Sequence, residues 1–195
     1  MCTVQKAHDV MFVYDSTSMG VKTSNAISEF LTKVVSGLDM GSGNLRIGRL
    51  TDDCPSGGNM PLSDKLSPED FSAFTLSSYS HMLRKLRRSG FTFEYGGRSD
   101  ATKIAVLFID ADMVDLDVDV LKEAKELAKT ATVYVVTLGS ADIVKKISGD
   151  KDFRVHMHVN PGQSLNDYSG VFLNRLCEVF SPESVDYDID YVVPV

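Results

Sequence analysis

An acidic residue and three hydroxyl residues directly follow an apolar run near the start of the chain. The stretch over residues 9–20 reads DVMFVYDSTSMG, with Asp15 after the apolar residues and then Ser16, Thr17 and Ser18. Carboxylate and hydroxyl oxygens are the hard ligands that Mg²⁺ and Ca²⁺ take in proteins. The same residue types also cap the first backbone N–H groups of a helix. The stretch therefore indicates either a cation site or a turn that leads into a helix.

A second carboxylate stands in the same kind of place. Residues 102–109 read TKIAVLFI, a continuous apolar run of the kind found in a strand covered on both faces, and Asp110 follows it. Because the carboxyl ends of parallel strands meet at one edge of a sheet, we expect Asp15 and Asp110 to lie close together. Repulsion between two such carboxylates favours a bound cation or a nearby lysine or arginine.

The elements that must position these residues alternate along the chain between strand and helix patterns. Predicted strands cover residues 10–14, 45–50, 60–62, 102–109, 132–138 and 153–159. Predicted helices cover residues 21–38, 76–88, 117–130, 141–147 and 164–180, and another begins near residue 67. This alternation predicts an α/β fold with a doubly wound open sheet, mostly parallel with one short antiparallel edge strand at 60–62, and helices on both faces.

Length and charge limit the other possibilities. The 195 residues suffice for one domain, which we place at 1–180, followed by an acidic, tyrosine-rich tail or linker at 181–195. A net charge of -7 argues against nucleic acid as the main partner. No apolar run approaches the ~20 residues of a membrane span, so none is expected. No signal peptide is visible before the first strand, which fits a cytosolic protein and equally a mature domain.

The cysteines leave two redox states open. Cys2 precedes the first strand, Cys177 lies in the last predicted helix, and Cys54 lies in a turn. The absence of a CxxC pair argues against a zinc site. Either all three are free thiols, or Cys2 and Cys177 form a disulfide that implies an oxidising compartment and leaves Cys54 over.

One predicted helix is strongly basic for an acidic protein. It carries Arg84, Lys85, Arg87 and Arg88. These cations could form a docking patch for a sulfated polysaccharide or for an acidic partner. The alternative is a solvated helix face, on which the helix dipole stabilises cations near the C-terminal end.

Motifs for catalysis are missing. The sequence has no GxSxG elbow, no phosphate-binding GxxxxGK[ST] and no GxGxxG after the first strand. We therefore expect a protein that is not an enzyme.

The order of these motifs resembles that of a von Willebrand factor type A domain. DVMFVYDSTSMG stands where the family has DVVFLIDGSGSI, and VLFIDAD stands where it has VITDG. TVYVVTLGSADIVKKISGDKDF is similar to the family's fifth strand and the helix after it, and NDYSGVFLNRLCEVF to its closing helix. The resemblance covers about residues 7 to 180 and is nearest to the domains of collagen-associated matrix proteins.

The resemblance implies a metal-ion-dependent adhesion site. Carried over by position, its ligands are Asp15, Thr17, Thr75 and Asp110, which would hold Mg²⁺, or Mn²⁺ or Ca²⁺, with an acidic group of the partner as the last ligand. The sequence departs from the family at Met19, which replaces a serine ligand, because a thioether is a poor ligand for Mg²⁺. Ser16 or Ser18 could take that place if the loop shifted by one residue.

The function that the resemblance implies is adhesion in an extracellular matrix. The partner would be collagen or another matrix protein, and the protein would be secreted. The alternative is an intracellular assembly factor of the same fold, with reduced cysteines and without a working metal site. A hydrolase of similar α/β architecture is the third possibility, against which the missing nucleophile motif argues.

Overall fold

The fold rests on a computed structural model, which describes residues 2, 4–51, 60–63, 79–110, 118–138, 146–147, 157–159 and 163–180. For Thr17, Ser18, Met60, Pro61 and His158 it describes the backbone alone. The strands are β1 His8–Val13, β2 Leu45–Leu50, β3 Met60–Ser63, β4 Thr102–Asp110, β5 Thr132–Leu138 and β6 Met157–Val159. The helices are α1 Ser16–Ser36, α2 Tyr79–Lys85, α3 Val118–Leu127 and α5 Ser169–Phe180. Shorter turns are Met40–Ser42, Leu86–Gly90, Phe93–Tyr95 and Leu165–Tyr168.

The strands form one sheet in the order β3-β2-β1-β4-β5-β6. β1 pairs in parallel with both β2 and β4, β4 with β5, and β5 with β6. β3 is antiparallel to β2 and forms one edge of the sheet. The predicted fold class is confirmed, including the antiparallel edge strand at residues 60–63.

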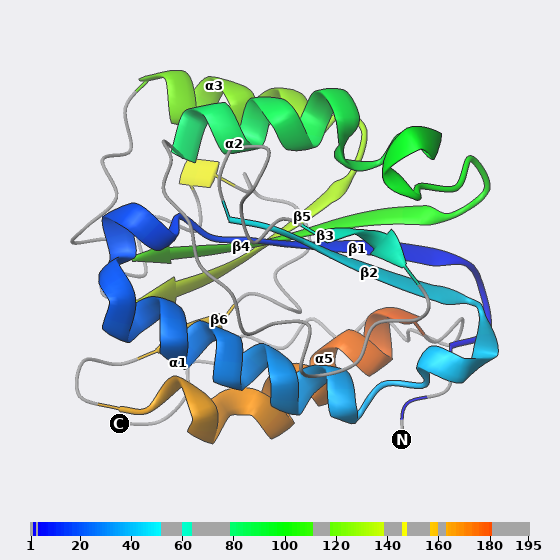
Figure 1. Ribbon diagram of the computed structural model, residues 1–195, viewed down its shortest axis with the longest axis horizontal. Helices are drawn as coiled ribbons and strands as arrows, with labels where there is room; N and C mark the ends of the chain where they lie inside the picture. Colours follow the sequence, from blue (N-terminus) through cyan, green and yellow to red (C-terminus); the bar gives the residue numbers. More distant parts are fainter. Residues whose placement is uncertain are drawn as a thin grey trace.

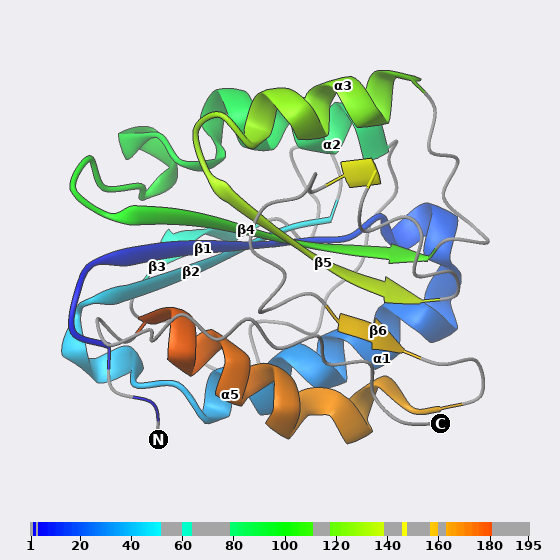
Figure 2. The same ribbon diagram turned by 180° about the vertical axis from the view of Figure 1, so that it is seen from behind.

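Helices cover both faces of this sheet. Figure 1 shows α2 and α3 above the sheet and α1 and α5 below it, and Figure 2 shows the same two layers from behind. Successive residues of a strand point to opposite faces, so the apolar run of β1 supplies both layers. Val10 and Phe12 pack on the side of α1 and α5, while Met11 and Val13 pack on the side of α2 and α3.

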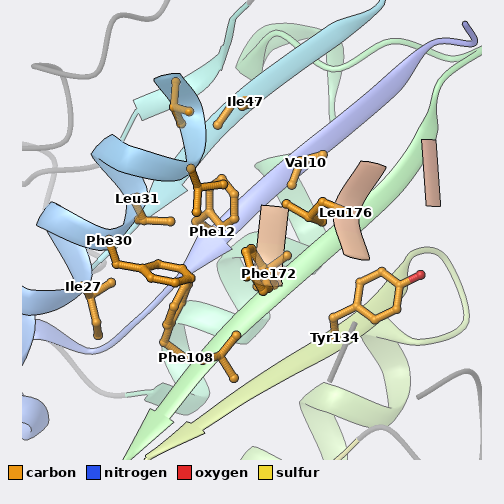
Figure 3. Close-up of a cluster of buried hydrophobic side chains, with 14 of the residues drawn as sticks. Val10, Phe12, Ile27, Phe30, Leu31, Ile47, Phe108, Tyr134, Phe172 and Leu176 are labelled. Atoms are coloured by element: carbon orange, nitrogen blue, oxygen red, sulfur yellow. The ribbon is translucent and has the colours of Figure 1, made fainter. Parts of the chain in front are cut away.

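Aromatic rings fill the layer between the sheet and the helices α1 and α5 (Figure 3). Phe30 of α1 lies with its ring centroid 5.8 Å from that of Phe108 on β4 and 5.3 Å from that of Phe172 on α5. Phe12 of β1 lies 6.3 Å from Phe108. These tilted and edge-on contacts bury large apolar surfaces and fix α1 and α5 on the sheet.

Two helices differ from their predicted form. α1 begins at Ser16, not at residue 21, and Gly20 interrupts it with φ 70 and ψ 170. Only glycine adopts this backbone conformation readily, so the turn 16–19 and the long helix after Gly20 are separate units. After α2 the chain continues in a π-helical turn, Leu86–Gly90, which hydrophobic periodicity does not reveal.

A disulfide closes almost the whole chain into one ring. Cys2 and Cys177 are joined, with their Cα atoms 5.6 Å apart and a sequence separation of 175 residues. The backbone N–H of Cys2 also donates to the carbonyl oxygen of Gly37 at 3.2 Å. The start of the chain is therefore held against both the end of α1 and the last helix.

A buried ion pair fixes the edge of the sheet where the parallel strands begin, here called the amino edge. Asp9 of β1 has no exposed surface, and the backbone N–H and Nε of Arg98 donate to its carboxylate at 2.7 and 2.9 Å. The guanidinium of Arg98 also donates to the carbonyl oxygens of His8, Gly43 and Asn44 at 2.8 to 3.0 Å. The loop before β4 is thereby tied to the first residues of β1 and to the chain before β2.

No helix in the part of the chain that the structure describes is long and apolar enough to cross a membrane.

Candidate metal site

The site predicted from the sequence lies where the sheet changes direction. The chain passes from β1 through α1 to β2 on one side, and from β4 through α3 to β5 on the other. The two crossovers therefore diverge between the neighbouring strands β1 and β4. In open α/β sheets this switch point, beyond the carboxyl ends of the strands, is where ligands bind.

Asp15 and Asp110 both lie at this carboxyl edge. β1 and β4 are parallel neighbours whose register pairs Val13 with Leu107. Asp15 follows the end of β1 by two residues, and Asp110 is the last residue of β4. Asp15 is fully buried and Asp110 is partly buried. The fold thus places at one edge of the sheet, on neighbouring strands, the two carboxylates that the sequence puts at strand ends.

The first turn of α1 is held by one hydrogen bond within the turn and one from the helix after Gly20. The backbone N–H of Met19 donates to the carbonyl oxygen of Asp15 at 3.1 Å, which closes the turn. The hydroxyl of Ser24 donates to the carbonyl oxygen of Ser16 at 3.3 Å. These bonds tie the turn that follows Asp15 to the long helix, so its backbone is fixed by the protein itself.

Met19 is buried in the core. Its side chain is 3% exposed and belongs to the apolar cluster that contains Phe30 and Phe108. The residue at the family's serine position is therefore a core residue in this chain.

A tyrosine from α2 borders Asp15 on the sheet face opposite α1. Tyr79 is buried and its hydroxyl donates to the carbonyl oxygen of Phe108 at 3.2 Å. Burial, and then the negative charge of Asp15, raise the pKa of the Tyr79 phenol well above its usual range. The phenol therefore stays neutral beside Asp15, and its proton remains available for the hydrogen bond to the carbonyl oxygen of Phe108.

Two buried hydroxyls at the same edge were missed in the sequence. Thr51 follows the last residue of β2, and Thr137 on β5 pairs in register with Ile109, the neighbour of Asp110. Both are fully buried. The signal that could have found them is the one that singled out Asp15, a polar side chain at the carboxyl end of an apolar strand.

The donor chemistry of this edge fits a hard divalent cation. Asp15 and Asp110 offer carboxylate oxygens, and Ser16, Thr51 and Thr137 are hydroxyl residues at the ends of β1, β2 and β5. Within the described ranges no group of three or more His, Cys, Asp or Glu side chains could hold a metal, so further ligands would be hydroxyl oxygens or water, as Mg²⁺ accepts. Thr75 lies outside the described residues, as do the side chains of Thr17 and Ser18.

The basic helix is partly engaged within the protein. Nε of Arg84 donates to Glu123 of α3 at 2.8 Å, and Nε of Arg87 donates to the same carboxylate at 3.0 Å. Glu123 is 5% exposed. Two of the four predicted patch cations therefore join α2 and the π-helical turn to α3, whereas Lys85 is partly exposed and Arg88 exposed.

This ion-pair cluster makes stability depend on acid. The hydrogen bond from Arg84, helped by that from Arg87, lowers the pKa of Glu123 below its ordinary value of 4.5, against the opposing effect of burial. The stabilisation is therefore complete above that value and is lost as the pH falls through the lowered pKa. We expect Glu123→Gln to cost stability at pH ~7 and progressively less as the pH falls below the ordinary value of 4.5, measured by urea unfolding. For the control Glu178→Gln, at an exposed site on α5, the difference in unfolding free energy from the wild type should not change with pH. If the difference between Glu123→Gln and the wild type were also constant with pH, the account would be contradicted.

Comparisons with known proteins agree on the fold. No protein-family model matches the chain, and no curated protein does. Among solved structures, proximal thread matrix protein 1 from the mussel byssus is 17% identical with a TM-score of 0.68, over 91% of this chain and 50% of that protein. Another structure of the mussel protein is described as having a zinc-occupied MIDAS motif, where MIDAS stands for metal-ion-dependent adhesion site.

Two bacterial proteins are similar in the same way. The pilus adhesin SpaC from Lactobacillus rhamnosus GG is 10% identical with a TM-score of 0.68, over 92% of this chain and 31% of SpaC. A von Willebrand factor type A protein from Catenulispora acidiphila is 16% identical with a TM-score of 0.57, over 89% of this chain and 43% of that one. The chain thus spans half or less of each of these proteins. The sheet order, the helical layers and these similarities together show that the chain has the von Willebrand factor type A fold.

Proposed function

We propose that this chain is a non-enzymatic adhesion module of an extracellular matrix protein, which binds its partner through a divalent cation at the carboxyl edge of the sheet. One observation carries the proposal: Asp15 and Asp110 follow or end the neighbouring parallel strands β1 and β4, at the switch point of the sheet. The cation would be Mg²⁺, or Mn²⁺ or Ca²⁺.

The chain's own residues would hold the cation and shape its surroundings. Asp15 and Asp110 would supply carboxylate oxygens, with hydroxyls from the turn 16–18 and from Thr75 completing the set that the fold family implies. A bound cation would attract an acidic side chain of the partner as its last ligand. Tyr79, kept neutral beside Asp15, adds no charge of its own to the site.

Three findings support adhesion over other roles of this fold. The similar structures include a matrix protein and a pilus adhesin. One of them is described with a metal in the corresponding motif. The disulfide between Cys2 and Cys177 suits an oxidising, extracellular location.

The second candidate is an intracellular assembly factor that binds without metal. Met19 favours it, because this core residue takes the place of one ligand. The disulfide argues against it, since such bonds are rare in reducing compartments. Free Cys2 and Cys177 in protein isolated without reductant would support the assembly factor.

Binding to matrix proteins tests the proposal. We expect the chain to bind surfaces coated with collagen, or with another matrix protein, in Mg²⁺ and to lose this binding in EDTA. Asp110→Asn removes one carboxylate charge with little change of shape and should abolish binding as EDTA does.

The matched control is Asp100→Asn, which removes an exposed carboxylate from the loop before β4, at the opposite edge of the sheet. It should bind as the wild type does. Binding that survives both EDTA and Asp110→Asn would refute the cation mechanism, and no binding to any matrix protein would refute the adhesion role.

A further inference from the structure

An aromatic side chain stands almost fully in solvent at the amino edge. Phe93 is 88% exposed. It lies in the turn Phe93–Tyr95, in the green segment after α2 that Figure 1 shows at the end of the molecule where β1 begins. Phe91 and Tyr95 on either side are packed against the α2–α3 core instead.

The loop that carries Phe93 is firmly held. The backbone N–H groups of Gly96 and Gly97 donate to the carbonyl oxygens of Phe93 and Thr92 at 3.0 and 2.8 Å. Arg46 donates to the carbonyl oxygen of Gly96 at 2.7 Å, and Arg98 ties the end of the loop to Asp9. An exposed aromatic ring on a preorganised loop loses little entropy when a partner covers it.

Cations lie on the helical turn that precedes this loop. The turn of Phe93 packs on the π-helical turn, where the backbone N–H and hydroxyl of Thr92 both donate to the carbonyl oxygen of Ser89. Arg88 of that turn is exposed and Lys85 is partly exposed. We call Lys85, Arg88 and Phe93 the basic–aromatic surface. Arg84 and Arg87 lie next to this surface, where they bind Glu123 of α3, and two more acids of α3 act on them, Asp119 on Arg84 and Glu126 on Arg87. Glu94 follows Phe93 in the turn. The acids of α3 therefore act on Arg84 and Arg87, whereas Lys85 and Arg88 are the cations proposed here for a partner.

The C-terminal tail has the complementary chemistry. Residues 181–195 read SPESVDYDIDYVVPV, with four acidic residues, no lysine or arginine, and apolar or aromatic residues between the acids. The ring of Phe180, the last residue of α5, lies 4.9 Å from that of His8, whose carbonyl oxygen accepts from Arg98. The tail thus leaves the fold at the amino edge. Fifteen residues reach about 50 Å when extended, more than the roughly 40 Å across a domain of this size.

We propose that the acidic tail, residues 181–195, docks on the basic–aromatic surface of its own chain. The tail offers both kinds of group that this surface takes: its carboxylates for the cations, and its valine, isoleucine and tyrosine side chains for the ring of Phe93. Attachment to α5 gives the tail an effective concentration in the millimolar range, which favours its own domain over a second copy. An acidic ligand for this surface must displace the tail.

Fluorescence of the full chain tests this, because the protein has no tryptophan. Phe93→Trp introduces one reporter on the surface. We expect a blue-shifted emission and a quenching constant for acrylamide several-fold lower than for Val118→Trp, the matched control at an 81% exposed site where α3 begins. Replacing Asp186, Asp188 and Asp190 by asparagine, or adding about 1 M salt, should restore full quenching at position 93, because charge attraction is then removed or screened.

Three results would overturn the proposal. Equal quenching at positions 93 and 118 would show that nothing covers the surface. Protection that survives the tail substitutions would assign the cover to another part of the chain. Protection that rises with protein concentration would assign it to the tail of a second copy.

Discussion

Replacing Cys2 and Cys177 by serine is expected to lower the free energy of unfolding by about 5 kcal/mol. The disulfide spans 175 residues, and a loop of that length restricts the unfolded chain by roughly this amount in the chain-entropy account. A loss of this size is comparable with the whole stability of many domains. Urea unfolding of the wild type and the double variant measures it.

A reducing agent supplies the matched control for this prediction. It should destabilise the wild type by the same amount as the double substitution, and should leave the double variant unchanged. Equal free energies of unfolding for wild type and double variant under oxidising conditions would show that the disulfide does not stabilise the fold.

Arg98→Ala should cost about 3–5 kcal/mol, because it leaves the buried carboxylate of Asp9 without its partner. The substitution also removes the donors to three backbone carbonyl oxygens at the amino edge. Arg98→Lys keeps the charge but loses the planar fork of donors, so we expect an intermediate loss. The midpoint of urea unfolding measures each change.

The control is Lys122→Ala, which removes an exposed cation from α3 and should change stability by less than about 0.5 kcal/mol. Asp9→Asn combined with Arg98→Ala should cost less than the sum of the two single changes, since the pair acts as a unit. Additive effects would mean that Asp9 and Arg98 stabilise the fold independently.

The sheet could be predicted because its strands carry strong local signals. The apolar runs at residues 10–14, 102–109 and 132–138 are short and continuous, which is typical of strands buried on both faces. They correspond to β1, β4 and β5. The short run broken by Pro61 became the antiparallel edge strand β3. Turn residues and alternation with helices then left few possible topologies.

The interactions that hold the edges together could not be predicted in the same way. Asp9 and Arg98 are 89 positions apart, and the sequence around each residue does not indicate that the two form an ion pair. The π-helical turn at Leu86–Gly90 keeps an ordinary helical pattern in its sequence. Such features depend on tertiary contacts, which local propensity does not encode.

The candidate metal site stays a prediction. Strand ends singled out Asp15 and Asp110, because a carboxylate after a buried strand is an unusual pattern, and the fold places both at the carboxyl edge of the sheet. Met19 was expected to be a poor ligand beside the cation, but its side chain packs in the core. Its direction depends on the turn before Gly20, whose conformation the sequence leaves open.

Calorimetric titration of the metal-stripped protein with Mg²⁺, Mn²⁺ and Ca²⁺ tests the central claim most directly. We expect saturable binding of at least one of these ions by the wild type and by Asp100→Asn, and no binding by Asp110→Asn. No binding by the wild type, or equal binding by Asp110→Asn, would contradict a cation site at the carboxyl edge.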